Sequence, residues 1–421
     1  MTASDRFERQ LPELFEDLAS ARIPDYFDDM LQATARTRQR PAWLSFERWL
    51  PMDTALPAAS GRSRTFAWLG ALALVGLLIA AALLAYAGSR PHRVPAPFGP
   101  AGNGSIYSVA ANGDLFTVDP TTDAMKTILT GAKADAVLPS LDGLQIAFAG
   151  KVLGGEGLSV ANQDGSNSHA LPGAWTNVSE LAWSPKSDEV AIVSEVAGVS
   201  SLSILPADGS PSKTLPLGLE VHNFWSQPDG TFVFAGTKGT GGARTYGLYV
   251  VNADGSGLRA IEPPTAAEAD WQALNASQDG RSLVYYRWRD PGEKGRLHVV
   301  DIASGKDTQV QVTGTVDGEA HEGALFSPDG MSLLFKRYAP DGSMRLAVVP
   351  VAGGAAVSIG PAVPNDQSPN AGYSPDGKTV IAWYPSTKEL WLLDPTGGTA
   401  GGDRKLDLAV TDTPTWQRVA P

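Results

Sequence analysis

The sequence lacks cysteine, and its five histidines are scattered along 421 residues. Without cysteine the chain can form no disulfide, no thiolate metal site and no cysteine nucleophile. The histidines show no short spacing typical of a zinc site, and neither a Gly-x-Ser-x-Gly nor a His-Glu-x-x-His motif occurs. We therefore expect no metal, no cofactor and no enzymatic activity. The adjacent pair His321-Glu322 is interpreted as an ordinary pair on a surface loop.

Positive charge is scarce in the larger part of the chain. Residues 1–89 are close to neutral, with 9 arginines and 10 acidic residues, whereas residues 90–421 hold 24 basic and 35 acidic side chains. Binding along a nucleic-acid backbone needs a positively charged surface. We therefore expect the large domain to have no nucleic-acid partner.

Long apolar runs are also absent, with one exception at residues 66–87, which contain no charged side chain. About 20 apolar residues suffice to cross a bilayer. Trp68 and Tyr86 stand near the two ends, where amphipathic rings favour the headgroup level. The run is apolar on every face and lies too far from Met1 for an ordinary signal peptide. We therefore predict a transmembrane helix over residues 65–88 rather than a buried core helix.

The charges on either side of this run predict its orientation in the membrane. Arg62 and Arg64 precede it, Arg90 and Arg93 follow it, and four more arginines lie within residues 36–48. This distribution favours a cytoplasmic N-terminus, since positive charge is enriched in cytoplasmic flanks. The sequence thus predicts a single-pass protein whose large C-terminal domain lies outside the cytoplasm.

Residues 1–64 contain short amphipathic helical pieces separated by prolines. Such pieces are too small to bury much surface alone, so they need a partner, the bilayer surface or one another. One interpretation is a cytosolic docking segment, with candidate contact residues Leu14, Phe15, Tyr26, Phe27, Trp43 and Trp49. The other is a loosely packed lead whose tryptophans rest at the membrane interface. Residues 89–101 follow the span as a proline-rich, semi-rigid linker.

A tight-turn motif, Ser374-Pro375-Asp376-Gly377, returns along the rest of the chain. Its copies recur at spacings of 44, 43, 50, 50 and 47 residues, counted at Asp142, Lys186, Asp229, Asp279, Asp329 and Asp376. Proline presets φ and glycine supplies the positive φ of the turn. One strand precedes each turn, a strongly apolar strand follows it, and two more flank a second turn of Asp-Gly type. Four antiparallel strands per roughly 45 residues are typical of a β-propeller blade.

The two ends of the repeat region complement each other. Residues 105–129 hold strands that match the second, third and fourth strands of a blade, but the first is missing. Residues 415–418 look like a first strand with nothing after it. Pairing these ends gives an all-β, seven-bladed propeller over residues 102–421 without exposed strand edges. Six blades is the alternative, if the weakest repeat is not a blade of its own.

The repeat pattern has a resemblance among known families. An aromatic residue followed by Ser-Pro-Asp-Gly (residues 326–330 and 373–377), an apolar strand and then Leu-Tyr-Val-Val-Asn-Ala-Asp-Gly (residues 248–255) resemble the TolB-like, WD-like propeller repeat of bacteria. The resemblance covers residues 101–421 and implies the fold, while propellers of this kind serve scaffolds, sensors and peptidases alike. TolB itself is a soluble periplasmic protein with six blades and a separate N-terminal domain. Together with the predicted span, the resemblance implies a bacterial cytoplasmic-membrane protein with an extracytoplasmic propeller.

The loops after the second strands carry a candidate partner-binding face. Two neighbouring blades place basic and aromatic side chains there, on an otherwise acidic domain: Arg287, Trp288, Arg289, Lys336, Arg337 and Tyr338. Arginine and tryptophan are enriched at binding hot spots. The alternative is that these are ordinary solvated loop residues.

A binding function fits these observations best. We interpret the chain as a single-pass protein that presents its propeller as a protein- or ligand-binding module, as a scaffold or a sensor. The expected partners are the membrane and a protein, and the identity of any small ligand stays open. The alternative is a membrane-bound regulator that resembles anti-sigma factors, with residues 1–53 bound to a cytosolic partner. That alternative lacks the His-x-x-x-Cys-x-x-Cys motif of many such proteins.

Overall fold

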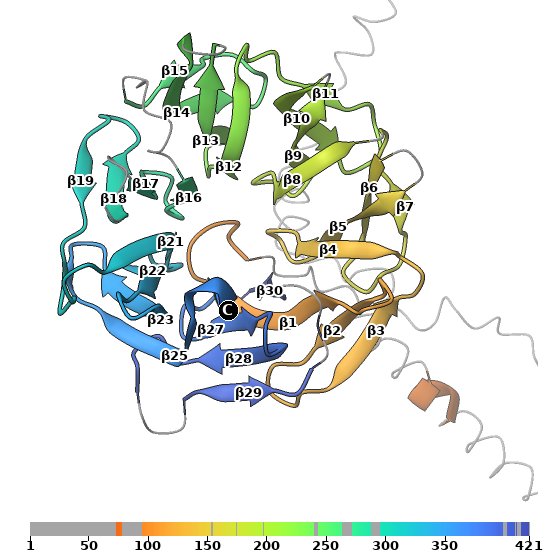
Figure 1. Ribbon diagram of the computed structural model, residues 1–421. Coiled ribbons are helices and arrows are strands. Elements are labelled where there is room, and N and C mark those ends of the chain that lie inside the picture. The colour runs from red at the N-terminus through yellow and green to blue at the C-terminus, as the bar shows by residue number, and fades with distance from the viewer. Residues whose placement is uncertain are drawn as a thin grey trace, which may run out of the picture. The chain divides into compact units, whose positions relative to one another are not determined.

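The propeller predicted from the repeats is the main body of the molecule. The computed structural model describes residues 73–77, 95–152, 155–173, 175–196, 198–239, 243–262, 272–287, 295–398, 402–408, 410 and 414–420. Within the unit of residues 92–421 it contains seven four-stranded antiparallel sheets. The sheets stand radially around a common axis (Figure 1). The prediction of an all-β, seven-bladed ring is confirmed, and the six-bladed alternative is wrong.

Each of the first four blades is named here from its innermost strand outwards. Blade 1 contains β30 (Thr415–Val419), β1 (Gly102–Val109), β2 (Leu115–Val118) and β3 (Met125–Leu129). Blade 2 contains β4 (Ala134–Pro139), β5 (Gln145–Val152), β6 (Gly155–Asn162) and β7 (His169–Ala170). Blade 3 contains β8 (Thr176–Trp183), β9 (Glu189–Val196), β10 (Val199–Pro206) and β11 (Lys213–Thr214). Blade 4 contains β12 (Glu220–Ser226), β13 (Thr231–Lys238), β14 (Thr245–Asn252) and β15 (Arg259–Ala260).

The last three blades follow the same order. Blade 5 contains β16 (Gln272–Ala276), β17 (Ser282–Arg287), β18 (Arg296–Asp301) and β19 (Asp307–Gln309). Blade 6 contains β21 (Ala320–Phe326), β22 (Ser332–Tyr338), β23 (Ser343–Pro350) and β25 (Val357–Pro364). Blade 7 contains β26 (Asn370–Tyr373), β27 (Val380–Tyr384), β28 (Glu389–Leu393) and β29 (Arg404–Leu406). Between blades lie a short parallel pair, β20 (Val312–Thr313) with β24 (Gly354–Ala355), and the 3-10 helix η4 (Asn365–Gln367).

The repeated Ser-Pro-Asp-Gly motif forms the turn between first and second strands, as the sequence predicted. In blade 7, the Ser374 hydroxyl donates to Asp376 Oδ1 at 2.7 Å, and the Lys378 amide donates to the same oxygen at 3.0 Å. The Thr379 amide donates to Ser374 Oγ at 3.0 Å, and Gly377 has a φ of 73°. The aspartate oxygen is therefore used by the turn itself.

The hydrophobic core is divided among the interfaces between blades. Side chains alternate along each second strand, so on β13 Phe232 and Phe234 pack toward blade 3, while Val233 and Ala235 pack toward blade 5. One apolar cluster lies between every two neighbouring blades, including blades 7 and 1. A strand buried on both faces needs apolar residues at consecutive positions. This explains the strongly apolar runs that follow each turn.

The ring closes through the C-terminal strand. β30 pairs antiparallel with β1, with Ile106 opposite Trp416 and Tyr107 opposite Thr415. The Gln417 side-chain amide donates to the Gly143 carbonyl of blade 2 at 2.7 Å. The strand therefore joins blade 1 while touching blade 2, which is the closure predicted from the complementary ends.

The membrane span predicted from the sequence falls almost entirely outside the described residues. Of that run, residues 73–77 are described and are helical, with Leu74 and Leu77 exposed. In the part of the chain that the structure describes, no helix is long and apolar enough to cross a bilayer. The predicted docking residues Leu14, Phe15, Tyr26, Phe27, Trp43 and Trp49 also lie outside the described residues.

Candidate binding face

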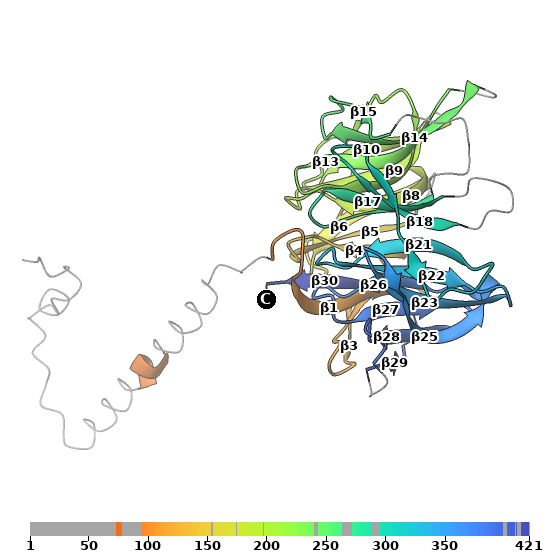
Figure 2. The same ribbon diagram turned by 90° about the vertical axis from the view of Figure 1, so that its left-hand side faces the viewer.

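The two faces of the propeller differ in which connections they carry. Because neighbouring strands are antiparallel, the Ser-Pro-Asp-Gly turns all lie on one face, here called the bottom face. First strands begin, and second strands end, on the opposite top face. In the edge-on view the leading segment before β1 and the C-terminus share one side of the ring (Figure 2).

Residues 95–101, here called the strap, lie against the bottom face. Arg418 Nη2 donates to the carbonyls of Ala96 at 3.0 Å and Gly99 at 2.6 Å. The Gly99 amide donates to the Gln278 side chain of blade 5, and the amide of residue 101 donates to the Pro375 carbonyl of blade 7. The strap thus contacts blades 1, 5 and 7. Seen along the axis, its ribbon passes inside the ring (Figure 1). Residues 95–101 of the lead-in therefore pack on the bottom face.

Five of the first strands, those of blades 2 to 6, contain a bulge. The pairing register shifts between Val221 and Phe224 on β12, between Thr176 and Glu180 on β8, and at matching places on β4, β16 and β21. A bulge leaves its extra residue unpaired and re-aims the neighbouring side chains. A bulge therefore places polar side chains on the channel wall. In a regular ladder these side chains would point into the blade.

A polar pocket of about 460 Å³ lies beside the bulge of blade 4, on the top-face side. Its lining includes Glu220, His222, Asn223, Arg244 and Tyr246. Arg244 Nη2 lies 3.0 and 3.1 Å from the two oxygens of Glu220, so these opposite charges cancel. His222 Nε2 lies 2.9 Å from the Thr237 hydroxyl. Desolvation lowers the pKa of His222, which favours a neutral ring at neutral pH, although Glu220 opposes this shift.

Two polar groups that β12 contributes to this pocket have no protein partner among the described residues. They are Nδ1 of His222 and the side-chain amide of Asn223. Both come from the bulged stretch of β12. A neutral pocket with unused donors and acceptors suits a ligand recognised by hydrogen bonds rather than by charge.

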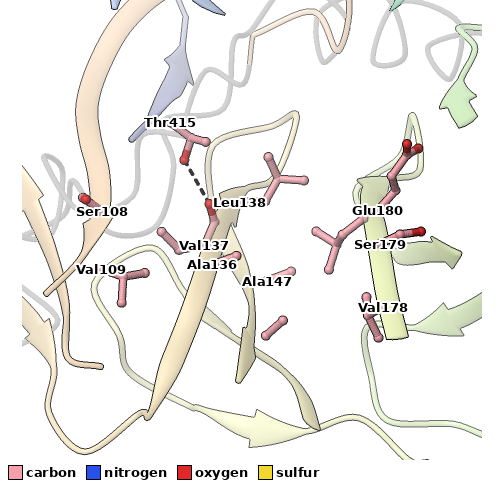
Figure 3. A pocket seen from close by; sticks show the side chains of 12 residues that line it. Ser108, Val109, Ala136, Val137, Leu138, Ala147, Val178, Ser179, Glu180 and Thr415 are labelled. Carbon is pink, nitrogen blue, oxygen red and sulfur yellow. Dashed lines mark hydrogen bonds between the residues drawn. The ribbon is translucent and has the colours of Figure 1, made fainter. Parts of the chain in front are cut away.

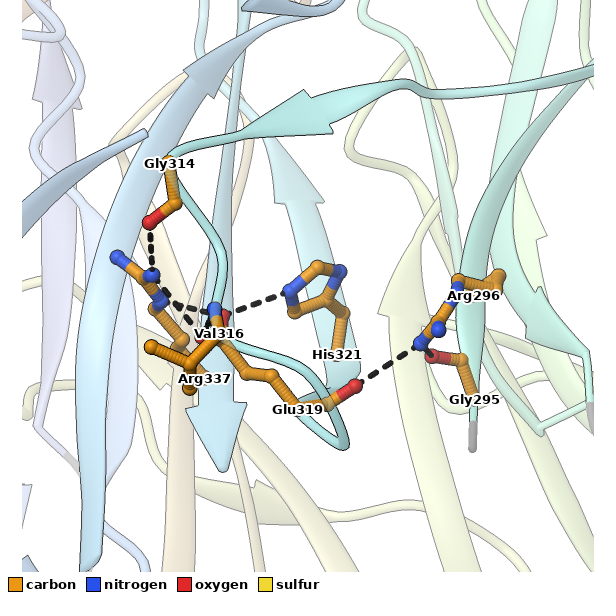
Figure 4. Close-up of polar contacts among 7 residues, drawn as sticks. All are labelled: Gly295, Arg296, Gly314, Val316, Glu319, His321 and Arg337. Carbon is orange, nitrogen blue, oxygen red and sulfur yellow. Dashed lines mark hydrogen bonds and ion pairs between the residues drawn. The ribbon is translucent and has the colours of Figure 1, made fainter. Parts of the chain in front are cut away.

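A second polar cluster joins blades 5 and 6 on the same face (Figure 4). Its centre is Glu319, just before β21, whose side chain is only 2% exposed. Arg337 donates to both carboxylate oxygens of Glu319, and its Nη2 also donates to the Gly314 carbonyl at 2.7 Å. Arg296 of blade 5 donates to the Glu319 backbone carbonyl at 2.9 Å. The cluster therefore ties the loop before β21 to two blades.

His321 completes this cluster. Its Nε2 lies 2.9 Å from Glu319 Oε1, and a carboxylate only accepts, so Nε2 carries the proton. Burial is the largest effect on both groups: it lowers the pKa of His321 and pushes that of Glu319 upward. Hydrogen bonds from Arg337 and His321 outweigh burial at Glu319, so its pKa lies below the ordinary value. The interpretation of His321-Glu322 as a surface loop pair is wrong, because His321 is 4% exposed on β21 and pairs with Glu319.

The candidate partner-binding residues of blade 6 lie on β22, not in the loop after it. Arg337 is bound to Glu319, and Tyr338 donates to the Ser368 hydroxyl at 3.3 Å. Lys336 stands opposite Glu322 across β21 and β22. Burial lowers the pKa of Lys336, while Glu322 acts in the opposite direction.

Of the blade 5 candidates, Arg287 is the last residue of β17, and Trp288 and Arg289 lie outside the described residues. Blades 5 and 6 are neighbours, but the described contacts do not join the six residues into one patch. Their role in partner binding stays a prediction.

Sequence reasoning did not single out Glu180, Asn223 or Glu319. One signal was available for Glu180, which stands alone as an acid in the otherwise neutral first strand Thr176–Trp183. Glu319 has a weaker signal in its position two residues before His321. Their partners lie in other strands or in neighbouring blades, so spacing along the chain could not reveal them.

Comparisons with known proteins identify the fold and no family. No protein-family model matches the chain, and no curated protein matches it. Among solved structures, the tricorn protease aligns with a TM-score of 0.55 and 12% identity over 78% of this chain. This chain spans only 36% of the length of that protease. An oligogalacturonate lyase in complex with manganese aligns with a TM-score of 0.52 and 13% identity, over 75% of this chain and 87% of that one.

A TolB structure also aligns with the chain. TolB from Acinetobacter baumannii matches with a TM-score of 0.46 and 14% identity, over 74% of this chain and 82% of that one. At these identities the similarity concerns the propeller fold alone. The seven four-stranded sheets show that the propeller fold implied by the repeat pattern is present, and no function follows from that fold.

The expectation of no enzymatic activity must be corrected. The ring is similar to structures whose names are those of enzymes, the tricorn protease and the oligogalacturonate lyase. The absence of short catalytic motifs does not exclude enzymatic activity here, because a propeller draws its site residues from several blades. Within the described residues, no group of three or more His, Asp or Glu side chains could hold a metal ion.

Proposed function

We propose that this chain is a binding module that takes a protein or ligand on the top face of its propeller. The observation that carries the proposal is the pocket of about 460 Å³ beside the bulge of β12. It presents Nδ1 of His222 and the Asn223 amide, which have no protein partner among the described residues. Buried apolar interfaces on both sides of each blade hold these groups on a rigid frame.

The proposal includes a membrane anchor at residues 66–87, with the propeller outside the cytoplasm of a bacterial cell. Its support is the uncharged run of 22 residues and the arginines that precede it. The strap supports the choice of face, because the chain enters the propeller at the bottom and leaves the top face open to a partner.

Partner capture by the full-length chain in its native membrane tests the face. The double variant H222A/N223A should reduce the yield of a cross-linked partner at least tenfold, because it removes the two unused polar groups that β12 contributes to the pocket. K378A, on an exposed bottom-face turn, is the matched control and should capture as well as the parent chain. Equal capture by H222A/N223A and the parent, or loss with K378A alone, would overturn the choice of face.

Topology is tested separately with single cysteines, since the parent chain has none. Cysteine at Ser210, an exposed turn residue of blade 3, should react with a membrane-impermeant reagent on intact spheroplasts. Cysteine at Ser45, before the predicted span, should react only after lysis. The opposite labelling pattern would contradict the predicted orientation.

A further inference from the structure

A second cavity lies on the channel wall where blades 1, 2 and 3 meet. Its volume is about 250 Å³, and most of its lining is apolar, including Val109, Val137, Leu138 and Val178. Figure 3 shows Val178 and Glu180 on β8, with Val137 on β4 across the cavity. An apolar cavity of ~150 Å³ is large enough for benzene. This one therefore has room for an aromatic ring with a short side chain.

Among the described residues that line this cavity, Glu180 has the only ionisable side chain. Its Oε2 accepts a hydrogen bond of 2.6 Å from the backbone amide of Phe224, on the next blade. Its Oε1 has no partner among the described residues. The carboxyl group is therefore held in place by blade 4, and one of its oxygens remains unused.

The surroundings of Glu180 offer no cation within the described side chains. Burial raises the pKa of Glu180 to about 7, and no neighbouring positive charge lowers it. The other titratable groups on the strands packed against β8 are Asp135 on β4, Glu156 on β6, Glu189 and Glu195 on β9, and Glu220 and His222 on β12. Five of these six are acidic, and Glu220 is already paired with Arg244.

We propose that this cavity binds a compact organic cation, a primary ammonium group on an apolar body, with Glu180 as its counter-ion. The apolar walls remove the body of the ligand from water. The unused oxygen of Glu180 accepts a charge-assisted hydrogen bond from the ammonium group. The site goes beyond the proposed partner capture, because it needs neither His222 nor Asn223.

Binding of a cation is coupled to the ionisation of Glu180. A positive charge beside a carboxyl group favours the ionised form and lowers its pKa. Complex formation near pH 7 therefore releases a proton from Glu180. With a pKa of about 7 in the free protein, affinity should rise about 30-fold between pH 5.5 and pH 8, because the ionised fraction rises by that factor.

Calorimetry on the full-length chain in detergent tests this site with phenethylammonium as the probe. The uncharged 2-phenylethanol and the anionic 3-phenylpropionate are matched probes of similar size. We expect binding of the cation alone, tightening about 30-fold from pH 5.5 to pH 8. Proton release at pH 7 should appear when buffers of different ionisation enthalpy are compared. Absence of cation binding, equal binding of 2-phenylethanol, or a flat pH profile would overturn the proposal.

Three variants complete the test. E180Q should weaken cation binding at pH 8 at least tenfold and abolish both the pH dependence and the proton release. A136L should block the cavity while leaving Glu180 intact, since Ala136 is an exposed lining residue whose enlargement does not disturb the core. E389Q, on the third strand of blade 7, is the matched control and should bind like the parent. Unchanged binding by E180Q or by A136L would refute the site, and H222A/N223A should retain it even if partner capture fails.

Discussion

At the scale of single residues, Glu319 is the side chain on which most local contacts depend. Its carboxylate accepts from Arg337, from His321 and from the Val316 amide at 3.2 Å. The Glu319 side chain is 2% exposed and that of Arg337 is 18% exposed. Removing one member of a buried ion pair leaves the other charge buried without a partner. The free energy lost in this way exceeds the free energy that the intact pair contributes to stability.

E319Q should therefore lower the free energy of unfolding by about 3 kcal/mol. Chemical denaturation of the parent and the variant measures this difference. E389Q is the control, because Glu389 forms a comparable pair with Lys405 that is 28% and 48% exposed. An exposed pair contributes about 0–1 kcal/mol, so E389Q should change little. A loss for E319Q no larger than that for E389Q would contradict the structural role of the cluster.

The same cluster should make the propeller less stable in acid. The pKa values of His321 and Glu319 are both lowered in the folded protein, from ordinary values of 6.5 and 4.5. Below those ordinary values the unfolded chain binds more protons than the folded one, so stability falls as pH falls. Thermal unfolding measured from pH 7 to pH 4 should show a melting temperature that begins to decline near pH 6.5. H321Q should flatten its upper part, and an unchanged profile for H321Q would exclude His321 as the cause.

At the scale of elements, the side chain of Arg418 supplies two of the hydrogen bonds that hold the strap before β1. Arg418 on β30 donates to two carbonyls of the strap, those of Ala96 and Gly99. Because Arg418 belongs to the C-terminal strand, the two ends of the propeller domain hold each other in place. The sequence showed this stretch as a proline-rich linker and gave no sign that it packs against the ring.

R418A should release the strap without opening the ring. The variant loses two hydrogen bonds from a charged donor, so the free energy that holds the strap on the ring should fall by about 2 kcal/mol or more. Hydrogen exchange measured by mass spectrometry should become faster for residues 96–101 and stay unchanged in β1 and β2. K378A is the control, because Lys378 is exposed on the same face and its described hydrogen bonds do not reach the strap. Unchanged exchange in R418A would show that the other contacts alone hold the strap.

At the scale of the whole molecule, stability depends on ring closure. Every described blade packs against two neighbours, and the cluster between blades 7 and 1 includes Ile106, Phe116 and Trp383. β30 pairs with β1 and also reaches blade 2, through Thr415 Oγ1 to the Val137 carbonyl at 3.1 Å. Losing this strand leaves β1 as an unpaired edge beside the channel.

Deletion of residues 415–421 should lower the free energy of unfolding by at least about 4 kcal/mol, because a strand ladder and its contacts with blade 2 are lost together. The melting temperature should fall by roughly 6 °C or more. Calorimetry measures the fall, and a synthetic peptide of residues 412–421 added in trans should reverse part of it. A deletion that melts like the parent chain would contradict closure by β30.

The sequence alone determined what depends on local chemistry and on periodicity. The turns around Asp376 and Asp329 need only residues a few positions apart, so they could be counted, and the unmatched strands at 105–129 and 415–418 predicted the closure. Tertiary structure decided what depends on register and on distant strands. A bulge on β12 places Asn223 in a pocket, and blade packing brings the Phe224 amide to Glu180, 44 residues away. A shift of one residue turns a side chain to the other face of a strand, and spacing along the chain does not show such shifts.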